Sequence, residues 1–191
     1  MIRQVLDVFL EKGRQLDVDT LLPLGTDEWI DALRSLDTPT LDYDDSAAGV
    51  FSEGTFFEAF RRDLMNAKES IVIFTPFMTV NGGTRWMDVL AMKAQNGIPV
   101  RVVTRPPFDQ GGVLTEEAEA FLSGIADTNV VLDMRARMHE KLAIIDNDVL
   151  WVGSLNIFSH RNTSEIMLRI PTRSGCEQMA EFVASKRNGN N

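Results

Sequence analysis

Residues 139–156 read HEKLAIIDNDVLWVGSLN, and this stretch decides the fold. Two mostly apolar runs, KLAIID at 141–146 and VLWVGS at 149–154, flank the polar pair Asn147 and Asp148. Apolar runs on either side of a two-residue polar turn are typical of a β-hairpin. We therefore predict two antiparallel strands joined by a tight turn at Asn147-Asp148.

Outside the hairpin, strand-like and helix-like patterns alternate along the chain. The run IVIFTPF at 71–77 predicts a buried strand, and apolar residues at helical spacing predict a helix just before it. Further strands are expected at 99–104, 129–134 and 164–170, and helices at 54–69, 84–96, 115–125 and 175–186. Because alternating strands and helices form parallel sheets whereas hairpins are antiparallel, we predict an α/β fold: a mixed β-sheet flanked by helices on both faces.

Charge is unevenly distributed along the chain. Residues 1–45 hold 11 acidic and 4 basic residues, whereas residues 46–191 hold 17 acidic and 15 basic residues. We predict an acidic helical segment and linker over 1–45, one globular domain over 46–187 and a disordered tail over 188–191. The net charge of −9 argues against a tight free-standing DNA binder, but a nearly neutral domain can still present a local basic cleft.

Composition narrows the class further. A single cysteine cannot form an internal disulfide, and two histidines without a cysteine cluster do not supply a zinc site. No run of 18 apolar residues occurs in the chain, so we expect no transmembrane helix. We therefore expect a cytoplasmic protein that uses no metal and no cofactor and does not associate with a membrane.

Side-chain alternation gathers polar residues at one end of the hairpin. His139 and Lys141 are two residues apart on one strand, so they project from the same face of the sheet. The return strand brings Ser154 and Asn156 beside them by the same rule. Ammonium, amide and hydroxyl donors suit the oxygens of a phosphodiester, and a histidine can act as nucleophile or as acid and base near neutral pH.

The spacing H-x-K-x4-D-x6-G-S-x-N, from His139 to Asn156, resembles the signature of the phospholipase D superfamily. Glu165 in HRNTSEIML is similar to the acid that members carry shortly after this signature. The stretch FFEAFRRDLMNAKESIVIFTPFM at 56–78 resembles the opening helix and strand of the family domain. The resemblance covers roughly residues 50–187.

This resemblance implies a phospholipase D-like fold and a role for each matched residue. His139 would attack phosphorus and form a covalent phosphohistidine. Lys141 and Asn156 would hold the phosphoryl oxygens, and Ser154 would hydrogen-bond near the histidine and the phosphate. Glu165 would accept the other ring N–H of the histidine and so fix its tautomer.

Three more residues are candidates for the site. Asp146 belongs to the matched pattern and so to the catalytic candidates, but its place beside the hairpin turn favours a structural role. Arg137 and Arg161 are candidate substrate contacts because they lie two residues before His139 and just after the GSxN strand. Arg105 could line the same cleft but is less favoured, and surface solubility is the alternative for all three arginines.

The family chemistry uses two copies of the motif, whereas this chain carries one. Residues 1–138 contain no histidine, and His160 has no lysine two residues later. We therefore expect a homodimer in which His139 of each copy meets at a two-fold axis.

A metal-independent nuclease that cleaves DNA or RNA is the function that this reasoning favours. A phospholipid phosphodiesterase or phosphatidyltransferase is one alternative, although the sequence shows no amphipathic basic helix. A catalytically idle nucleic-acid-binding or dimerisation module is the other. Similar family domains form the C-terminal part of larger helicase-type proteins. We therefore also consider a helicase or ATPase, either as a partner of this chain or as the protein that contains it.

Overall fold

The protein is described by a computed structural model over residues 47–125, 128–159 and 164–188. These residues all belong to one compact unit. The predicted acidic segment at 1–45 and residues 189–191 of the predicted tail lie outside the described residues, so the predicted domain boundaries stay predictions.

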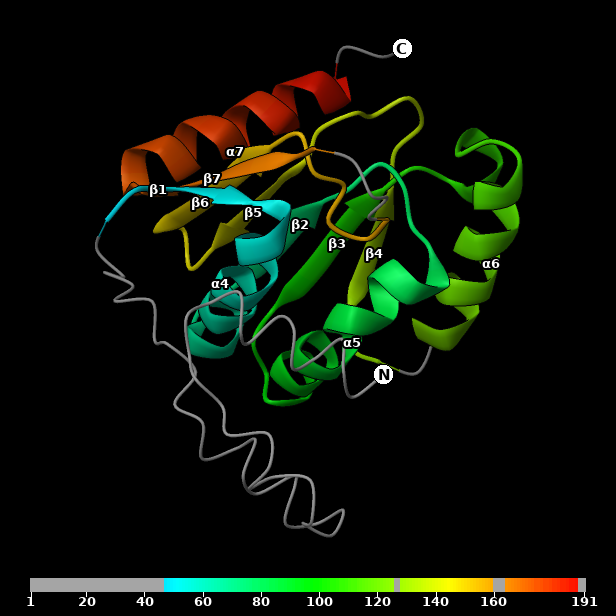
Figure 1. The fold of residues 1–191 in the computed structure, drawn as a ribbon, viewed down its shortest axis with the longest axis horizontal. Coiled ribbons are helices and arrows are strands. Elements are labelled where there is room, and N and C mark those ends of the chain that lie inside the picture. The colour runs from blue at the N-terminus through cyan, green and yellow to red at the C-terminus, as the bar shows by residue number, and fades with distance from the viewer. Residues whose placement is uncertain (1–46, 126–127, 160–163, 189–191) are drawn as a thin grey trace, which may run out of the picture. The chain divides into compact units, whose positions relative to one another are not determined.

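Seven strands form one mixed sheet within the described residues (Figure 1). They are β1 (Gly49–Ser52), β2 (Ile71–Phe74), β3 (Val100–Thr104), β4 (Val131–Met134), β5 (Leu142–Ile145), β6 (Val149–Gly153) and β7 (Ile166–Pro171). The strand order is β1-β7-β6-β5-β2-β3-β4. Strands β2, β3 and β4 pair in parallel, and the other neighbours pair antiparallel. The predicted mixed α/β sheet is confirmed, whereas β1 was not predicted.

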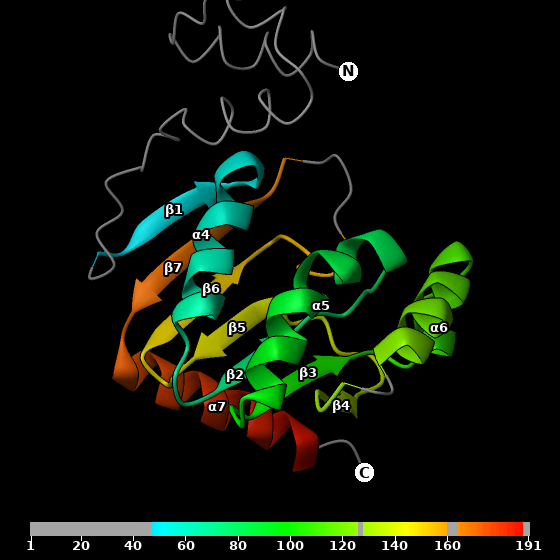
Figure 2. The same ribbon diagram turned by 90° about the horizontal axis from the view of Figure 1, so that it is seen from below.

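Helices lie on both faces of this sheet, as predicted. They are α4 (Glu53–Asn66), α5 (Val80–Gln95), α6 (Val113–Ile125) and α7 (Arg173–Asn188), with a short 3-10 turn η1 (Pro107–Asp109). Figure 2 shows α4 and α5 over one face and α7 over the other. Among the described helices, none combines the length and the apolar character that crossing a membrane requires.

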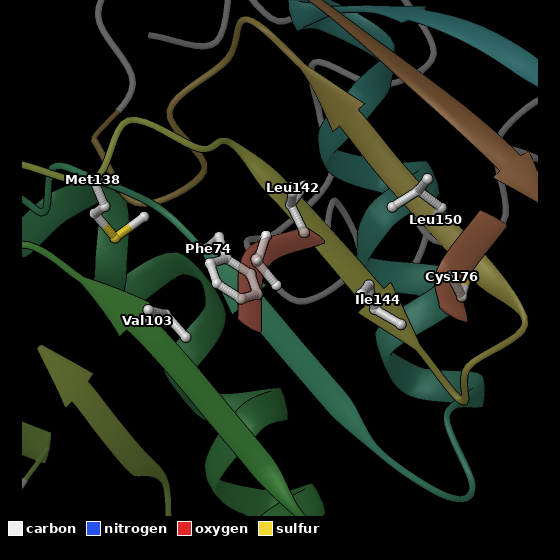
Figure 3. Packing of buried hydrophobic residues seen from close by; sticks show 8 residues of the cluster. Phe74, Val103, Met138, Leu142, Ile144, Leu150 and Cys176 are labelled. Atoms are coloured by element: carbon white, nitrogen blue, oxygen red, sulfur yellow. The ribbon is translucent and has the colours of Figure 1, made fainter. Parts of the chain in front are cut away.

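Strand β6 shows how the two faces are filled. Leu150 belongs to the apolar cluster that includes Cys176 and Val183 of α7 (Figure 3). The next residue, Trp151, points to the opposite face, where its ring packs against Phe56 of α4 with centroids 5.3 Å apart. Because successive residues of a strand face opposite sides, a strand covered on both faces must be apolar at nearly every position.

A buried ion pair joins α4 to the two strands next to it. The Asp63 carboxylate accepts hydrogen bonds from Arg169 Nε at 2.7 Å and Nη2 at 3.1 Å, and from the Trp151 indole N–H at 2.7 Å. A buried carboxylate is tolerated only when donors satisfy it, as they do here. This network fixes α4 relative to β6 and β7.

The hairpin between β5 and β6 turns through Asp146, Asn147 and Asp148, because Ile145 pairs with Val149. Asp146 and Asn147 have positive φ angles, 54° and 53°, and the Asp148 N–H donates to the Ile145 carbonyl at 3.0 Å. A tight turn of this kind requires positive φ at both central residues, which Asp and Asn adopt more readily than most residues. The turn therefore includes the predicted pair Asn147-Asp148 and begins one residue earlier, at Asp146.

Candidate active site

The imidazole of His139 and the ammonium group of Lys141 lie side by side. Both residues directly precede β5. Lys141 Nζ donates a hydrogen bond to His139 Nε2 at 3.2 Å and another to the His139 carbonyl at 3.2 Å. His139 is exposed and Lys141 is half-buried. The structure thus brings together the two residues that alternation predicted to share a face.

The pKa values of both groups are lowered, that of His139 mainly by the nearby Lys141 charge and that of Lys141 mainly by burial. The Lys141 ammonium lowers the pKa of His139 from its ordinary value of 6.5; burial and the Arg105 guanidinium add to this effect, and Glu140 opposes it. Burial lowers the pKa of Lys141, Arg105 acts in the same direction, and Glu165 and Glu140 oppose it. Because lysine is the stronger base, it keeps its proton and His139 accepts at Nε2. The neutral ring then carries its proton on Nδ1.

Where β6 ends, its backbone lies beside Lys141. The Gly153 N–H donates to the Lys141 carbonyl at 3.2 Å, and the Ser154 N–H donates to the Ile166 carbonyl at 3.0 Å. Ser154 Oγ accepts from the Ile166 N–H at 3.2 Å. Glycine is needed at 153 because a Cβ there would collide with the Ile166 carbonyl oxygen. Lys141, Ser154 and Ile166 therefore mark the same end of three neighbouring strands, β5, β6 and β7.

Asn156 belongs to a loop that the helices and β2 hold in place. The Trp86 indole N–H donates to the Ile157 carbonyl at 2.9 Å, and the Phe158 N–H donates to Thr75 Oγ1 at 3.3 Å. Asn156 is half-buried, and its buried Oδ1 has no hydrogen-bond partner within the described part of the chain. Buried polar atoms without a partner are uncommon in folded proteins. This one follows β6 at the end of the sheet where His139 and Lys141 lie.

Two carboxylates act on the same pair of residues. Glu165 directly precedes β7, and its charge raises the pKa of Lys141. The predicted contact of Glu165 with the His139 ring stays a prediction. Glu140 Oε2 accepts a hydrogen bond from the His139 N–H at 2.8 Å, a contact that sequence reasoning missed.

Asp146 lies at the opposite end of β5 from Lys141. Its carboxylate accepts hydrogen bonds from the backbone N–H groups of Lys68, Glu69 and Ser70 at 2.8, 2.7 and 2.9 Å. Asp146 therefore ties the hairpin turn to the chain entering β2. The structure does not bring it together with His139, and its contacts are those of a structural residue.

Of the two predicted substrate arginines, Arg137 lies in the described part of the chain and Arg161 does not. Arg137 is exposed, has a φ of 60°, and its N–H donates to Asp109 Oδ2 at 2.6 Å. Arg161 lies outside the described residues. Across residues 47–125, 128–159 and 164–188, no cluster of three or more His, Cys, Asp or Glu residues could hold a metal ion.

A family model described as "Cardiolipin synthase, PLD-like domain" matches residues 60–185, a range that includes every predicted site residue. The chain belongs to the phospholipase D superfamily. A cardiolipin synthase of Listeria monocytogenes is 31% identical to this superfamily member over 127 residues, which cover 59% of this chain and 26% of the relative. The chain thus spans about a quarter of the length of that curated relative.

Solved structures of low sequence identity share the phospholipase D fold. Nuc from Salmonella typhimurium, a phospholipase D family member, has a TM-score of 0.63 and 21% identity, covering 74% of this chain and 94% of Nuc. TrmBL2, an archaeal chromatin protein that shows a novel mode of DNA binding, has a TM-score of 0.57 and 11% identity, covering 96% of this chain and 68% of TrmBL2. At these identities the likeness establishes the fold.

Sequence reasoning missed Phe77 and Asp109 near the phospholipase D-type histidine, and it gave Arg105 only as a less favoured cleft residue. The Phe77 ring meets the His139 ring edge to face with centroids 6.4 Å apart, and the Arg105 guanidinium lies over the Phe77 ring at 4.9 Å. Phe77 follows β2, and Arg105 and Asp109 follow β3. Their position was the available signal, because ligand sites of α/β sheets collect at the carboxyl ends of parallel strands.

Proposed function

We propose that this chain is a metal-independent phosphodiesterase that works through a covalent phosphohistidine at His139. The 3.2 Å contact between Lys141 Nζ and His139 Nε2 carries the proposal. It leaves a neutral imidazole, whose pKa Lys141 lowers, next to a fixed positive charge. An uncharged ring nitrogen is a nucleophile, and the adjacent ammonium group stabilises the negative charge that develops on the phosphoryl oxygens.

In this mechanism Lys141 Nζ transfers its hydrogen bond from His139 Nε2 to a phosphoryl oxygen of the bound substrate. The freed Nε2 lone pair attacks phosphorus, and the bond from phosphorus to the leaving oxygen breaks. Lys141 and Asn156 hold the non-bridging oxygens, and Ser154 lies beside them. Glu165 accepts a hydrogen bond from the Nδ1–H group and so keeps the ring in the reactive tautomer. Water then attacks the phosphohistidine and releases a phosphomonoester together with free His139.

The leaving oxygen needs a proton that His139 cannot supply while it acts as the nucleophile. His139 is the one histidine in the described ranges, and the whole chain holds two. In a homodimer, a second His139 that binds a proton faces the first and supplies the acid for the first step. The neutral ring that this leaves is the base for the second step. Such a dimer also places two Lys141 residues around one phosphate.

Nucleic acid is the substrate that we propose. Lys141 and Arg105 place positive charge near an exposed histidine, and phosphate contacts dominate the binding of nucleic acids. The fold likeness to TrmBL2, a protein that binds DNA, is compatible with this choice. A helicase or ATPase partner and a cytoplasmic location stay predictions.

Phosphatidyl transfer to a lipid alcohol is the second candidate, because a cardiolipin synthase is 31% identical to this chain over 127 residues. The chemistry at His139 is the same in both cases. The group attached to phosphorus differs, and a lipid alcohol replaces water as the acceptor in the second step.

A paired assay separates the two substrates. Single-stranded and double-stranded DNA, RNA, and phosphatidylglycerol vesicles are incubated with the protein in EDTA, each beside the His139→Ala variant. The proposal expects strand cleavage that the variant lacks. Cardiolipin formation without strand cleavage would assign the lipid function, and cleavage that persists undiminished in His139→Ala would refute the role of His139.

A further inference from the structure

Both polar groups of the peptide unit between Met138 and His139 make hydrogen bonds to side chains. The Met138 carbonyl accepts a hydrogen bond from Arg105 Nε at 2.6 Å, and the His139 N–H donates to Glu140 Oε2 at 2.8 Å. The oxygen and the N–H of one planar peptide unit are thus fixed from two sides. The plane of that unit sets the direction in which the His139 side chain leaves the backbone.

Arg105 also reaches the imidazole through an aromatic ring. Its guanidinium lies 4.9 Å from the centre of the Phe77 ring, and the Phe77 ring meets the His139 ring at an interplanar angle of 80°. Cation–π and edge-to-face contacts both have preferred geometries. The position of Arg105 therefore restricts the position of Phe77, which in turn restricts rotation of the histidine ring.

The loop before His139 adopts a conformation that needs support. Arg137 has a φ of 60°, which is unfavourable for a residue other than glycine. Its N–H is held by Asp109 Oδ2 at 2.6 Å, and Asp109 Oδ2 lies 3.9 Å from Arg105 Nε. Asp109 and Arg105 thus fasten two consecutive residues, Arg137 and Met138, directly before His139, from a loop that follows β3.

We propose that Arg105 is the positioning residue of the His139 nucleophile: it orients the imidazole through the Met138 carbonyl and the Phe77 ring. The inference rests on the proposed function. Arg105 has a second effect through its charge. Lys141 and Arg105 lower the pKa of His139 and Glu140 raises it, while Glu165 acts on the neighbouring Lys141. Arg105 thus favours both the orientation and the neutral form that attack on phosphorus requires.

Two variants separate the charge of Arg105 from its geometry. Arg105→Gln removes both, whereas Arg105→Lys keeps the charge and loses the planar group that donates to a carbonyl while stacking on a ring. Arg135→Gln is the matched control. Arg135 is also half-buried, lies over the Phe74 ring at 5.4 Å and donates to a backbone carbonyl, that of Val183 in α7, at 3.1 Å.

The decisive experiment is an NMR titration of the imidazole groups, which needs no substrate. The chain has two histidines, so His139→Ala assigns the signals. We expect Arg105→Gln to raise the pKa of His139, Arg105→Lys to leave it near the wild-type value, and Arg135→Gln to leave it unchanged. Equal shifts in Arg105→Gln and Arg135→Gln, or no shift in either, would overturn the proposal.

Kinetics test the orienting role. With a phosphodiester substrate, both Arg105 variants are expected to lose about tenfold to a hundredfold in kcat with little change in KM, because a small misplacement of the nucleophile slows the chemical step. Arg135→Gln is expected to keep its kcat. Full kcat in Arg105→Lys would refute the orienting role. Absence of turnover in the wild-type protein would count against the proposed function, and the titration would still test Arg105.

Discussion

The polar groups at the two ends of strand β5 have opposite roles. Before the strand, Lys141 and His139 place two basic groups 3.2 Å apart, and each has a lowered pKa. After it, Asp146 receives hydrogen bonds from three consecutive backbone N–H groups. One end keeps polar groups available for a ligand, and the other satisfies them within the fold. Four residues of strand, about 13 Å, separate a site of chemistry from a site of stability.

Replacing the nucleophile tests the catalytic end most strongly. We expect His139→Ala to reduce kcat by about 10⁴-fold or more, because covalent catalysis cannot proceed without the attacking group. Folding should not suffer. A group whose pKa is lower in the folded state binds its proton more weakly there, so acid pH favours the unfolded state. His139→Ala should therefore be at least as stable as the wild type below pH 6.5, measured by urea unfolding at pH 5 and pH 8.

Removal of the Lys141 ammonium group is expected to cause the next largest loss of activity. Lys141→Met is expected to lose about 10²- to 10³-fold in kcat, because a preorganised charge no longer stabilises the phosphoryl oxygens. The pKa of His139 should rise, since Lys141 is the main cause of its lowering. The acid limb of the pH–rate profile should then move to higher pH. Lys68→Met, which removes an exposed charge near the other end of β5, is the control. A similar loss of kcat in both variants would mean that the effect comes from the overall charge of the protein and not from the position of Lys141.

At the structural end, Asp146→Ala should cost stability and not chemistry. The variant leaves three backbone N–H groups without their acceptor and puts alanine at a φ of 54°. Together these changes should lower the free energy of unfolding by about 2–3 kcal/mol. Asp146→Asn keeps an acceptor oxygen and tolerates positive φ, so it should lose less. A kcat per folded molecule that falls with Asp146→Ala by as much as with Lys141→Met would erase the distinction between the two ends.

The smallest expected effect concerns the loop that holds Asn156. Thr75→Val preserves the side-chain shape but removes the Oγ1 that accepts from the Phe158 N–H at 3.3 Å. We expect a loss of about 1–2 kcal/mol in unfolding free energy, because a buried N–H is left unsatisfied. Activity should fall by only a few-fold, since Trp86 still holds Ile157. Activity lost as completely as in His139→Ala would mean that Thr75 itself takes part in the chemistry.

The hairpin and the His139–Lys141 pair were predictable because local rules govern them. Apolar runs around a polar turn fix the hairpin pairing. The contact between His139 and Lys141 was expected from alternation along one strand, although both residues lie just before β5. Arg105 was not predictable from such rules, because it meets Met138 across 33 residues of chain. Strand β1 was missed for a similar reason: its four residues carry no clear period, and only pairing with β7 makes them a strand.

The proposed mechanism depends most on a covalent bond between His139 and phosphorus, and a trapping experiment tests that bond directly. The protein is mixed with bis(p-nitrophenyl) phosphate, denatured at neutral pH during turnover, digested and analysed by mass spectrometry. The account predicts a p-nitrophenyl phosphoryl adduct on the peptide that contains His139, and none in His139→Ala. Turnover with no adduct at any time point, or with the adduct on another residue, would contradict it.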